Sequence, residues 1–316
     1  MSHSCLMAVV LGIFLSGCSS LQKPAQPQDP NTSQEGTRII PDVVYGHKFG
    51  MALTFDLFQP KKQNGGGVIF INSGGWHSPR FPDYYTETVE GLRLSTDQER
   101  AQIFPEYQGR PRIKPFLDKG FTVFVVRHGD SDKFKMGEIV SDMRRAVRFI
   151  RFHAGEYGID AERLGVWGGS AGGHLALLIG TTADIGNKDV TEELEKTTGR
   201  VAAVVAYFPP SVLQRPDDPD VLKRYPALDL TMEQAREFSP LNFVSPDDAP
   251  TLIVHGDQDK VVPIALGKAM YQATLKAGVK SKFVTIQGAG HGFTGKDDDR
   301  AMQEAISWFE EHLGAK

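Results

Sequence analysis

Cysteine is scarce in this chain, and positive charge is not in excess. Its 316 residues include only two cysteines, Cys5 and Cys18, which excludes a disulfide framework or a cysteine-based zinc site in the remainder. Lys and Arg number 35 against 39 Asp and Glu, a formal net charge of −4. Nucleic acid is not expected as a partner, because phosphate binding requires a basic surface. With 40% hydrophobic and 23% charged residues, the bulk of the chain is neither disordered nor fibrous.

Long hydrophobic runs are also missing. The run at residues 6–15 spans ten residues, whereas a bilayer-spanning helix needs about 20. It matches instead the hydrophobic core of a secretory signal peptide. The sequence LSGC at residues 15–18 follows directly and resembles a bacterial lipobox, which is cleaved before the cysteine that then carries the lipid. The resemblance implies a signal peptide at residues 1–17 and lipidation of Cys18. The alternative is a plain signal peptide with an incidental cysteine.

The segment after the lipobox lacks the apolar residues that folding requires. Residues 19–37 are rich in Pro, Gln and Ser, and such a stretch cannot bury enough surface to fold. Residues 18–37 are therefore predicted to be a lipidated flexible tether, which makes the protein an exported, membrane-anchored lipoprotein. Ser19, rather than Asp, follows the cysteine; by resemblance to lipoproteins this favours the outer membrane if the organism is Gram-negative.

Residues 38–316 alternate between short apolar runs and segments of helical periodicity. This alternation predicts an α/β fold, with a mostly parallel sheet and helices on both faces. Two long stretches without periodicity, at about 77–115 and 211–250, are predicted to be insertions that are functional or carry small helices. The expected elements are a strand pair at 43–58, strands at 68–72, 121–126, 164–167, 201–208, 251–255 and 282–287, and helices at 136–153, 171–179, 264–277 and 300–313.

A nucleophile elbow is indicated by the sequence GGSAG at residues 168–172. The pattern G-x-S-x-G alone is weak evidence, but here it lies between an expected strand and a helix of small residues. A serine on such a tight turn needs small neighbours, and the N-terminus of the helix offers free N–H groups to a developing oxyanion. Ser170 is therefore the candidate nucleophile.

A serine hydroxyl requires a base to accept its proton and a carboxylate to orient that base. The order along the chain in α/β-hydrolases is serine, acid, histidine. His291 lies in a glycine-rich loop after the last expected strand, and the acid is either Asp257 or Asp259. Both aspartates follow the strand at 251–255, so the spacing alone leaves the choice between them open.

The chain resembles α/β-hydrolases of the esterase and lipase type with an HGGGW-like oxyanion loop, in particular the BD-FAE-like group that includes acetyl-xylan and feruloyl esterases. The resemblance spans about residues 40–313 and is strongest at 157–176 and in the pattern H-G-x-x-D-x-x-V-P at 255–263. It implies Ser170 as nucleophile, Asp259 as acid and His291 as base, with no cofactor.

The oxyanion loop of that family aligns with the sequence NSGGW at residues 72–76, where Asn72 replaces the usual histidine. The resemblance implies that the N–H groups of Gly74, Gly75 and Ala171 stabilise the oxyanion, and that Asn72 holds the loop by hydrogen bonds. Each oxyanion donor typically lowers the barrier by about 3 kcal/mol.

Several polar residues are interpreted as structural. His174, His255 and Asp142 are expected to hold the fold rather than react. A metal site is not expected, because His77, His128, Asp130 and Asp132 match no zinc or calcium loop pattern. The sequence suggests no role for the loop at residues 127–131.

The sequence therefore predicts a serine carboxylic-ester hydrolase, and by analogy with the family its substrate is an ester of a polysaccharide, such as an acetyl or feruloyl ester. Trp76, Tyr84 and Tyr85, in and after the oxyanion loop, are predicted to contact the substrate, because aromatic faces suit sugar rings and aromatic acyl groups. The alternatives are a prolyl-oligopeptidase-like peptidase, for whose propeller domain the chain has no room, and a catalytically silent surface-binding lipoprotein.

Overall fold

The computed structural model describes residues 33–34, 37–79, 113–182 and 184–314. Contacts along the chain divide it after Pro30, and every described residue belongs to the part that begins at Asn31. Cys18, Tyr84 and Tyr85, which the sequence singles out, lie outside the described residues. No helix in the described part combines the length and the apolar character needed to cross a membrane.

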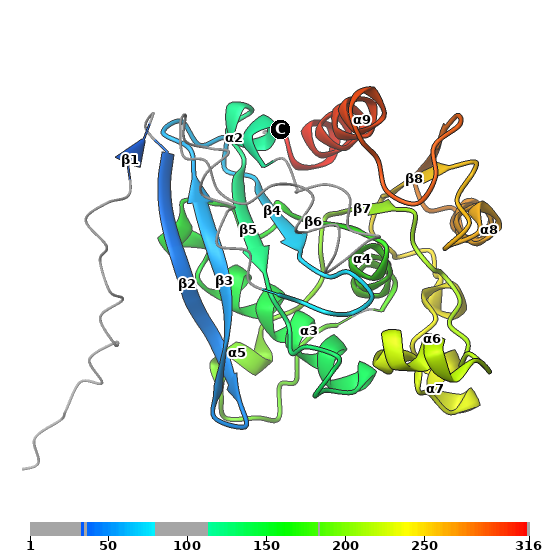
Figure 1. The fold of residues 1–316 in the computed structure, drawn as a ribbon. Helices are drawn as coiled ribbons and strands as arrows, with labels where there is room; N and C mark the ends of the chain where they lie inside the picture. The colour runs from blue at the N-terminus through cyan, green and yellow to red at the C-terminus, as the bar shows by residue number, and fades with distance from the viewer. Residues whose placement is uncertain (1–32, 35–36, 80–112, 183, 315–316) are drawn as a thin grey trace, which may run out of the picture. The chain divides into compact units, whose positions relative to one another are not determined.

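A single sheet of nine strands organises the described residues (Figure 1), in the order β1-β2-β3-β5-β4-β6-β7-β8-β9. Pairs β1–β2, β2–β3 and β3–β5 are antiparallel, and all the later pairs are parallel. This arrangement is the predicted mostly parallel α/β-hydrolase sheet. The strands are β1 Ser33–Gln34, β2 Thr37–Lys48, β3 Met51–Gln59, β4 Gly67–Ile71, β5 Thr122–Val126, β6 Leu164–Gly169, β7 Ala203–Tyr207, β8 Thr251–Gly256 and β9 Ser281–Ile286.

Helices cover both faces of the sheet, as predicted. Helices α3, α4 and α8 share one hydrophobic core with the sheet, and α2 and α9 pack in the core on the opposite face. The main helices are α2 Lys114–Asp118, α3 Met136–Phe152, α4 Ala171–Thr181, α8 Ile264–Lys276 and α9 Lys296–Leu313. Each predicted strand and helix of the body is therefore confirmed, with ends displaced by a few residues.

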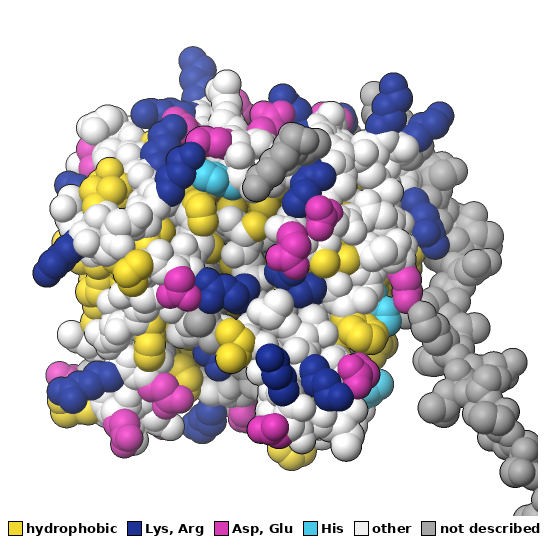
Figure 2. Space-filling view, turned by 180° about the vertical axis from the view of Figure 1, so that it is seen from behind, with side chains coloured by type: hydrophobic (Ala, Val, Ile, Leu, Met, Phe, Trp, Pro, Cys, Tyr) yellow, Lys and Arg dark blue, Asp and Glu magenta, His cyan; other side chains and the backbone are white. Residues whose placement is uncertain are grey.

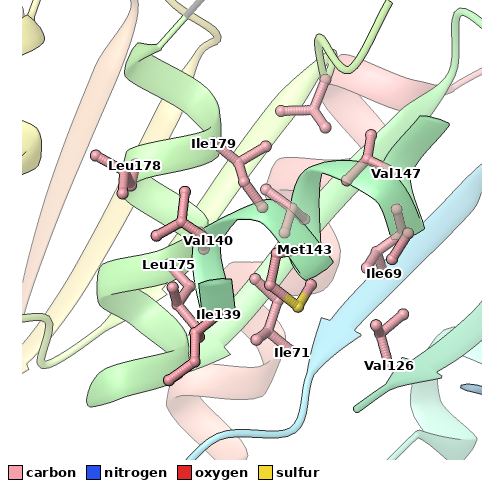
Figure 3. Packing of buried hydrophobic residues seen from close by; sticks show 14 of the residues in the cluster. Ile69, Ile71, Val126, Ile139, Val140, Met143, Val147, Leu175, Leu178 and Ile179 are labelled. Atoms are coloured by element: carbon pink, nitrogen blue, oxygen red, sulfur yellow. The ribbon is translucent and has the colours of Figure 1, made fainter. Parts of the chain in front are cut away.

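Alternation along the central strands decides which side chain enters which core. In β4, Ile69 and Ile71 belong to the core under α3 and α4, whereas Val68 and Phe70 belong to the core under α9. Successive side chains of a strand point to opposite faces, so a strand covered on both sides must be apolar throughout. Figure 3 shows Ile69 and Ile71 beside Met143 of α3. The buried stripe of α3 recurs with the helical period.

The N-terminal boundary of the folded part differs from the prediction. The tether was expected to extend to residue 37, but Ser33 and Gln34 form β1, paired with Arg38 and Thr37 of β2. Main-chain pairing to the long hairpin of β2 and β3 thus gives order to residues whose composition alone predicts none. The hairpin turns at Phe49, which has a positive φ of 47°.

The insertion at 211–250 carries short helices, which was one of the two expectations for it. They are α6 Pro219–Arg224, η3 Pro226–Leu228, α7 Met232–Glu237 and η4 Pro240–Phe243. A capping box between Thr231 and Gln234 starts α7. The remaining short helices are η2 Ala154–Tyr157 and α5 Glu193–Lys196.

One face of the surface is seen in Figure 2, where basic and acidic side chains are interspersed. No large region of one sign is visible among the described residues on that face. The distribution on that face agrees with the small formal net charge of −4.

Candidate active site

Ser170 lies at the sharp turn between β6 and α4. Its φ of 51° and ψ of −120° fall in a region that non-glycine residues avoid. The glycines around it are required by close contacts: a Cβ atom at Gly168 would lie 2.5 Å from the backbone of Gly172, and one at Gly172 would lie 2.7 Å from the carbonyl oxygen of Ile71. The turn therefore has the geometry that the sequence predicts for a nucleophile elbow.

His291 reaches Ser170 from the loop that follows β9. Its Nε2 atom lies 2.9 Å from Ser170 Oγ, and its Nδ1 atom lies 2.8 Å from Asp259 Oδ2. An ionised carboxylate can only accept, so Nδ1 carries the proton and Nε2 is free to accept the serine hydroxyl. The ring of Phe208 packs against the imidazole at a centroid distance of 4.7 Å and restricts its orientation. These contacts bring the predicted base to the predicted nucleophile.

Asp259, rather than Asp257, is the carboxylate beside the histidine. Its Oδ1 atom accepts the N–H groups of Val261 and Val262 at 2.9 and 2.8 Å, and Oδ2 faces His291. Burial on its own raises the pKa of Asp259, but hydrogen bonds from His255 and His291 outweigh burial and hold the pKa well below its usual range. Asp257 instead accepts the N–H of Gly288 at 2.7 Å. The structure thus resolves the choice that the spacing left open.

Gly75 and Ala171 are the candidate donors to an oxyanion at Ser170. Among the described residues, their N–H groups have no backbone acceptor. Gly74 does not fit its predicted role, because its N–H donates to the carbonyl oxygen of His77 at 3.0 Å. That bond closes the turn after β4, so Gly74 shapes the turn while Gly75 and Ala171 are the candidate oxyanion donors.

Hydrogen bonds hold the turn formed by residues 72–79. Asn72 is fully buried and its Nδ2 donates to the carbonyl oxygen of Pro79 at 2.7 Å, which confirms that it holds the loop. Ser73 Oγ lies 2.8 Å from Nε2 of His128, whose Nδ1 donates to the carbonyl of Gly129. Burial lowers the pKa of His128 to about 4, so the ring is neutral and accepts the serine proton.

Trp76 lies buried in the oxyanion turn, so it has a structural role, and its contact with substrate stays a prediction. Only 5% of Trp76 is exposed, and its indole N–H donates to Nδ1 of His174 at 3.2 Å. His174 Nε2 donates in turn to the carbonyl oxygen of Phe238 at 2.7 Å. Burial lowers the pKa of His174 to about 4. The expected structural role of His174 is thereby confirmed, since both ring nitrogens are satisfied.

The loop at 127–131, which the sequence left without an account, is a structural junction. Arg127 is buried and its guanidinium contacts Asp56 at 2.6 Å and Asp42 at 2.9 Å. Asp142 of α3 also serves structure, as expected: it pairs with Lys48 at 2.6 Å. These partners come from the antiparallel edge of the sheet, far away in sequence, which is why local patterns did not reveal them.

One group of side chains in the described residues has ligand atoms close enough for a metal ion: His77, Asp130 and Asp132. Two of these three residues already have hydrogen-bond partners. Asp130 Oδ1 accepts from His77 Nδ1 and from the N–H of Asp132, and Oδ2 accepts from the N–H of Ser78, each at 3.0 Å. The carboxylate of Asp132 lies further away, with Oδ1 3.8 Å from His77 Nδ1.

Comparison with known proteins places the chain in a family. The sequence model of the BD-FAE family matches residues 105–274, more than half of the chain. The chain belongs to the BD-FAE family. The esterase LipC of Mycobacterium tuberculosis is 31% identical over 198 residues, 59% of this chain and 48% of that protein. The probable carboxylic ester hydrolase LipM of the same organism is 26% identical over 166 residues, 50% of this chain and 38% of that protein.

Among solved structures, the truncated form of a carbohydrate esterase from gut microbiota has a TM-score of 0.67 and 25% identity, covering 92% of this chain and 99% of that one. The α/β-hydrolase fold of this BD-FAE member is therefore shared over almost the whole of a known esterase structure. The chain spans only about half or less of the curated relatives that it matches.

Two residues beside the site were not found by sequence reasoning. Phe208 packs on His291, and its positive φ of 36° turns the chain toward the imidazole directly after β7. Tyr225 lies over the oxyanion turn, where its Cδ1 would be 2.8 Å from a Cβ atom at Gly75. Neither belongs to a motif, and only the position of Phe208 after a buried strand could have indicated it.

Proposed function

We propose that this BD-FAE member hydrolyses carboxylic esters through a covalent acyl-serine. Ser170 Oγ attacks the ester carbonyl as His291 Nε2 accepts its proton, and Asp259 stabilises the imidazolium that results. The N–H groups of Gly75 and Ala171 stabilise the oxyanion. His291 then protonates the leaving alcohol, and a water molecule, deprotonated by the same imidazole, hydrolyses the acyl-serine.

The observation that carries this proposal is the continuous hydrogen-bonded set Ser170–His291–Asp259, with distances of 2.9 and 2.8 Å. Esterase names among the relatives support the ester as substrate. Hydrolysis of p-nitrophenyl acetate and labelling by a fluorophosphonate probe test the proposal together. A catalytically silent lipoprotein would give neither signal, because only an activated serine reacts with the probe.

For the substrate class we propose acyl esters of polysaccharides, acetyl or feruloyl. The support is the likeness to a carbohydrate esterase at 25% identity and the family to which the chain belongs. Rates on acetylated xylan, feruloylated sugars, p-nitrophenyl esters and Xaa-Pro peptides would distinguish this class from simple esters and from the peptidase alternative. Replacing Tyr84 and Tyr85 by Ala should raise KM for the carbohydrate esters and leave p-nitrophenyl acetate unchanged, if they bind sugar.

For the location we propose export and anchoring through a lipid on Cys18. The support is the apolar run at residues 6–15 and the LSGC sequence that ends at the cysteine. Multiple acyl chains would hold the protein firmly on a membrane surface. The catalytic part would then act on esters outside the cytoplasm, where polysaccharide substrates are found.

A further inference from the structure

His77 ends the oxyanion turn and contacts two other segments of the protein. Its backbone pairs with Gly74, N–H to carbonyl in both directions, at 2.9 and 3.0 Å. Its ring reaches Asp130 Oδ1 through Nδ1 at 3.0 Å and the carbonyl oxygen of Arg224 through Nε2 at 3.2 Å. The loop after β5, the oxyanion turn and helix α6 of the insertion therefore meet at one imidazole.

The partners of the ring define its protonation state. A backbone carbonyl accepts but cannot donate, and the same holds for an ionised carboxylate. Ser131 Oγ, 3.3 Å from Nδ1, can also accept, and donation from both nitrogens to these acceptors makes the ring an imidazolium. The hydrogen bond to Asp130 raises the pKa of His77 to about 9. Asp130 accepts hydrogen bonds from the N–H groups of Ser78 and Asp132. These bonds position the carboxylate that pairs with the His77 imidazolium.

The turn that His77 closes contains the candidate oxyanion donor. Gly75 lies between the two paired residues, Gly74 and His77, and the ring of Tyr225 covers it. Arg224 ends α6 and Tyr225 follows it, so this point of the insertion contacts the turn twice, once by the carbonyl of Arg224 and once by the ring of Tyr225. A displacement of the turn would move the N–H of Gly75 away from the position in which the oxyanion forms.

We propose that His77 is a positioning residue for ester hydrolysis: its two N–H groups tie the oxyanion turn to Asp130 and to Arg224, and thereby hold the Gly75 N–H in place. The proposal rests on the proposed function of this site. His77 does not touch the reacting atoms, and it acts through the turn. Its effect should fall on kcat, because an oxyanion donor contributes to the transition state and little to substrate binding.

Because the role of His77 requires a protonated ring, kcat should depend on pH. The charged groups that face the ring are Asp130 and Asp132, both on the loop after β5, and the nearby His128 is neutral because burial lowers its pKa to about 4. The contact from the insertion is the uncharged carbonyl of Arg224. Above a pH of about 9 the ring loses one proton, and a neutral imidazole cannot donate to both acceptors. The wild-type kcat should therefore fall on an alkaline limb that His77 variants lack.

The experiment compares wild type with H77A, H77Q and the matched control H153A. His153 is 21% exposed and pairs with Glu156 at 3.1 Å, whereas His77 is 17% exposed, so the control removes a similar pair remote from the turn. Measurements are kcat and KM for p-nitrophenyl acetate from about pH 6 to pH 10, and the inhibition constant of a boronic acid that mimics the tetrahedral intermediate. Thermal unfolding checks that each variant is folded.

H77A should lower kcat roughly 10- to 100-fold with little change in KM, and weaken the boronic acid by a similar factor. H77Q, which can donate but cannot titrate, should recover part of kcat at pH 7 and lack the alkaline limb. H153A should match wild type.

An active wild type whose kcat changes by less than about twofold in both His77 variants, or whose alkaline limb persists in H77Q, would refute this proposal and leave the proposed function intact. A wild type without ester hydrolysis would refute the proposed function and, with it, the role of His77. Loss of wild-type activity in EDTA would also overturn the proposal, since it would mean that a metal ion replaces the proton at Nδ1. If H77A does not fold, the kcat and the pH profile of H77Q test the proposal.

Discussion

His255 Nε2 lies 3.3 Å from Oδ2 of Asp259, the oxygen that also faces Nδ1 of His291 at 2.8 Å. His255 Nε2 also donates to the carbonyl of Val262 at 2.9 Å, so this ring is fixed by the motif in which Asp259 lies. The carboxylate accepts from His291 and from two backbone N–H groups, and the single Nε2 proton of His255 lies between it and the Val262 carbonyl. These donors keep the carboxylate ionised and aligned with the base.

The acid can be tested by two neighbouring substitutions. D259N should lower kcat by about 10³–10⁴, because an amide in that place favours the wrong tautomer of His291. D257N should change kcat little, since Asp257 contacts the N–H of Gly288 rather than the imidazole. Steady-state hydrolysis of p-nitrophenyl acetate measures both variants. A larger loss in D257N than in D259N would overturn the assignment.

Gly75 should tolerate no side chain while Tyr225 is in place. A Cβ atom there would lie 2.8 Å from the Tyr225 ring, and the residue has a positive φ of 57°. G75A should therefore lower kcat by roughly 10- to 100-fold by displacing the oxyanion donor. The double variant G75A/Y225A should recover part of the loss. If G75A alone retains wild-type kcat, Gly75 is not the donor.

Much of the fold could be predicted because short-range patterns in the sequence specify it. The continuous apolar run of β4 and the 3.6-residue stripe of α3 specify their elements directly. The hydrogen bond of Trp76 could not be predicted because its partner His174 lies 98 residues away. Gly74 was misread because the sequence shows which residues are glycine but not which N–H a turn consumes. Ser33 and Gln34 pair with β2 in the sheet, which composition cannot indicate.

Two buried histidines should make the folded state sensitive to mild acid. Burial lowers the pKa of His128 and of His174 to about 4 from the usual 6.5. The unfolded chain binds more protons between those values, so the stability that each neutral ring contributes is present above pH 6.5 and is lost as pH falls toward 4. Each of the two histidines should therefore lower the free energy of unfolding by about 2 kcal/mol at pH 5.

Denaturant unfolding at pH 7 and pH 5 measures that effect. H174Q should show a shallower decrease between the two values than wild type, whatever its absolute stability, and H153A should keep the wild-type decrease. His77 has the opposite sign: its pKa of about 9 is raised, so its contribution is complete below pH 6.5 and is lost as pH rises through 9. Equal slopes in wild type and H174Q would contradict the neutral, buried state of His174.

Lipidation predicts where the protein is found. C18S should move the protein from the membrane to the soluble fraction of a host that processes lipoproteins, because the acyl chains provide the anchor. Hydrolysis of a soluble ester should persist, since the substitution lies outside the catalytic part. Fractionation of wild type and C18S side by side gives the answer. Wild-type protein that is already soluble in such a host would rule out the anchor.

The proposed ester hydrolysis depends most on the reactivity of Ser170. The direct measurement is the intact mass of wild type and S170A after incubation with a fluorophosphonate, followed by peptide mapping of the adduct. We expect one adduct on wild type, located at Ser170, no adduct on folded S170A, and a loss of ester hydrolysis in S170A of more than about a thousandfold. An unlabelled wild type, an adduct at another residue, or an S170A variant that retains the activity would contradict it.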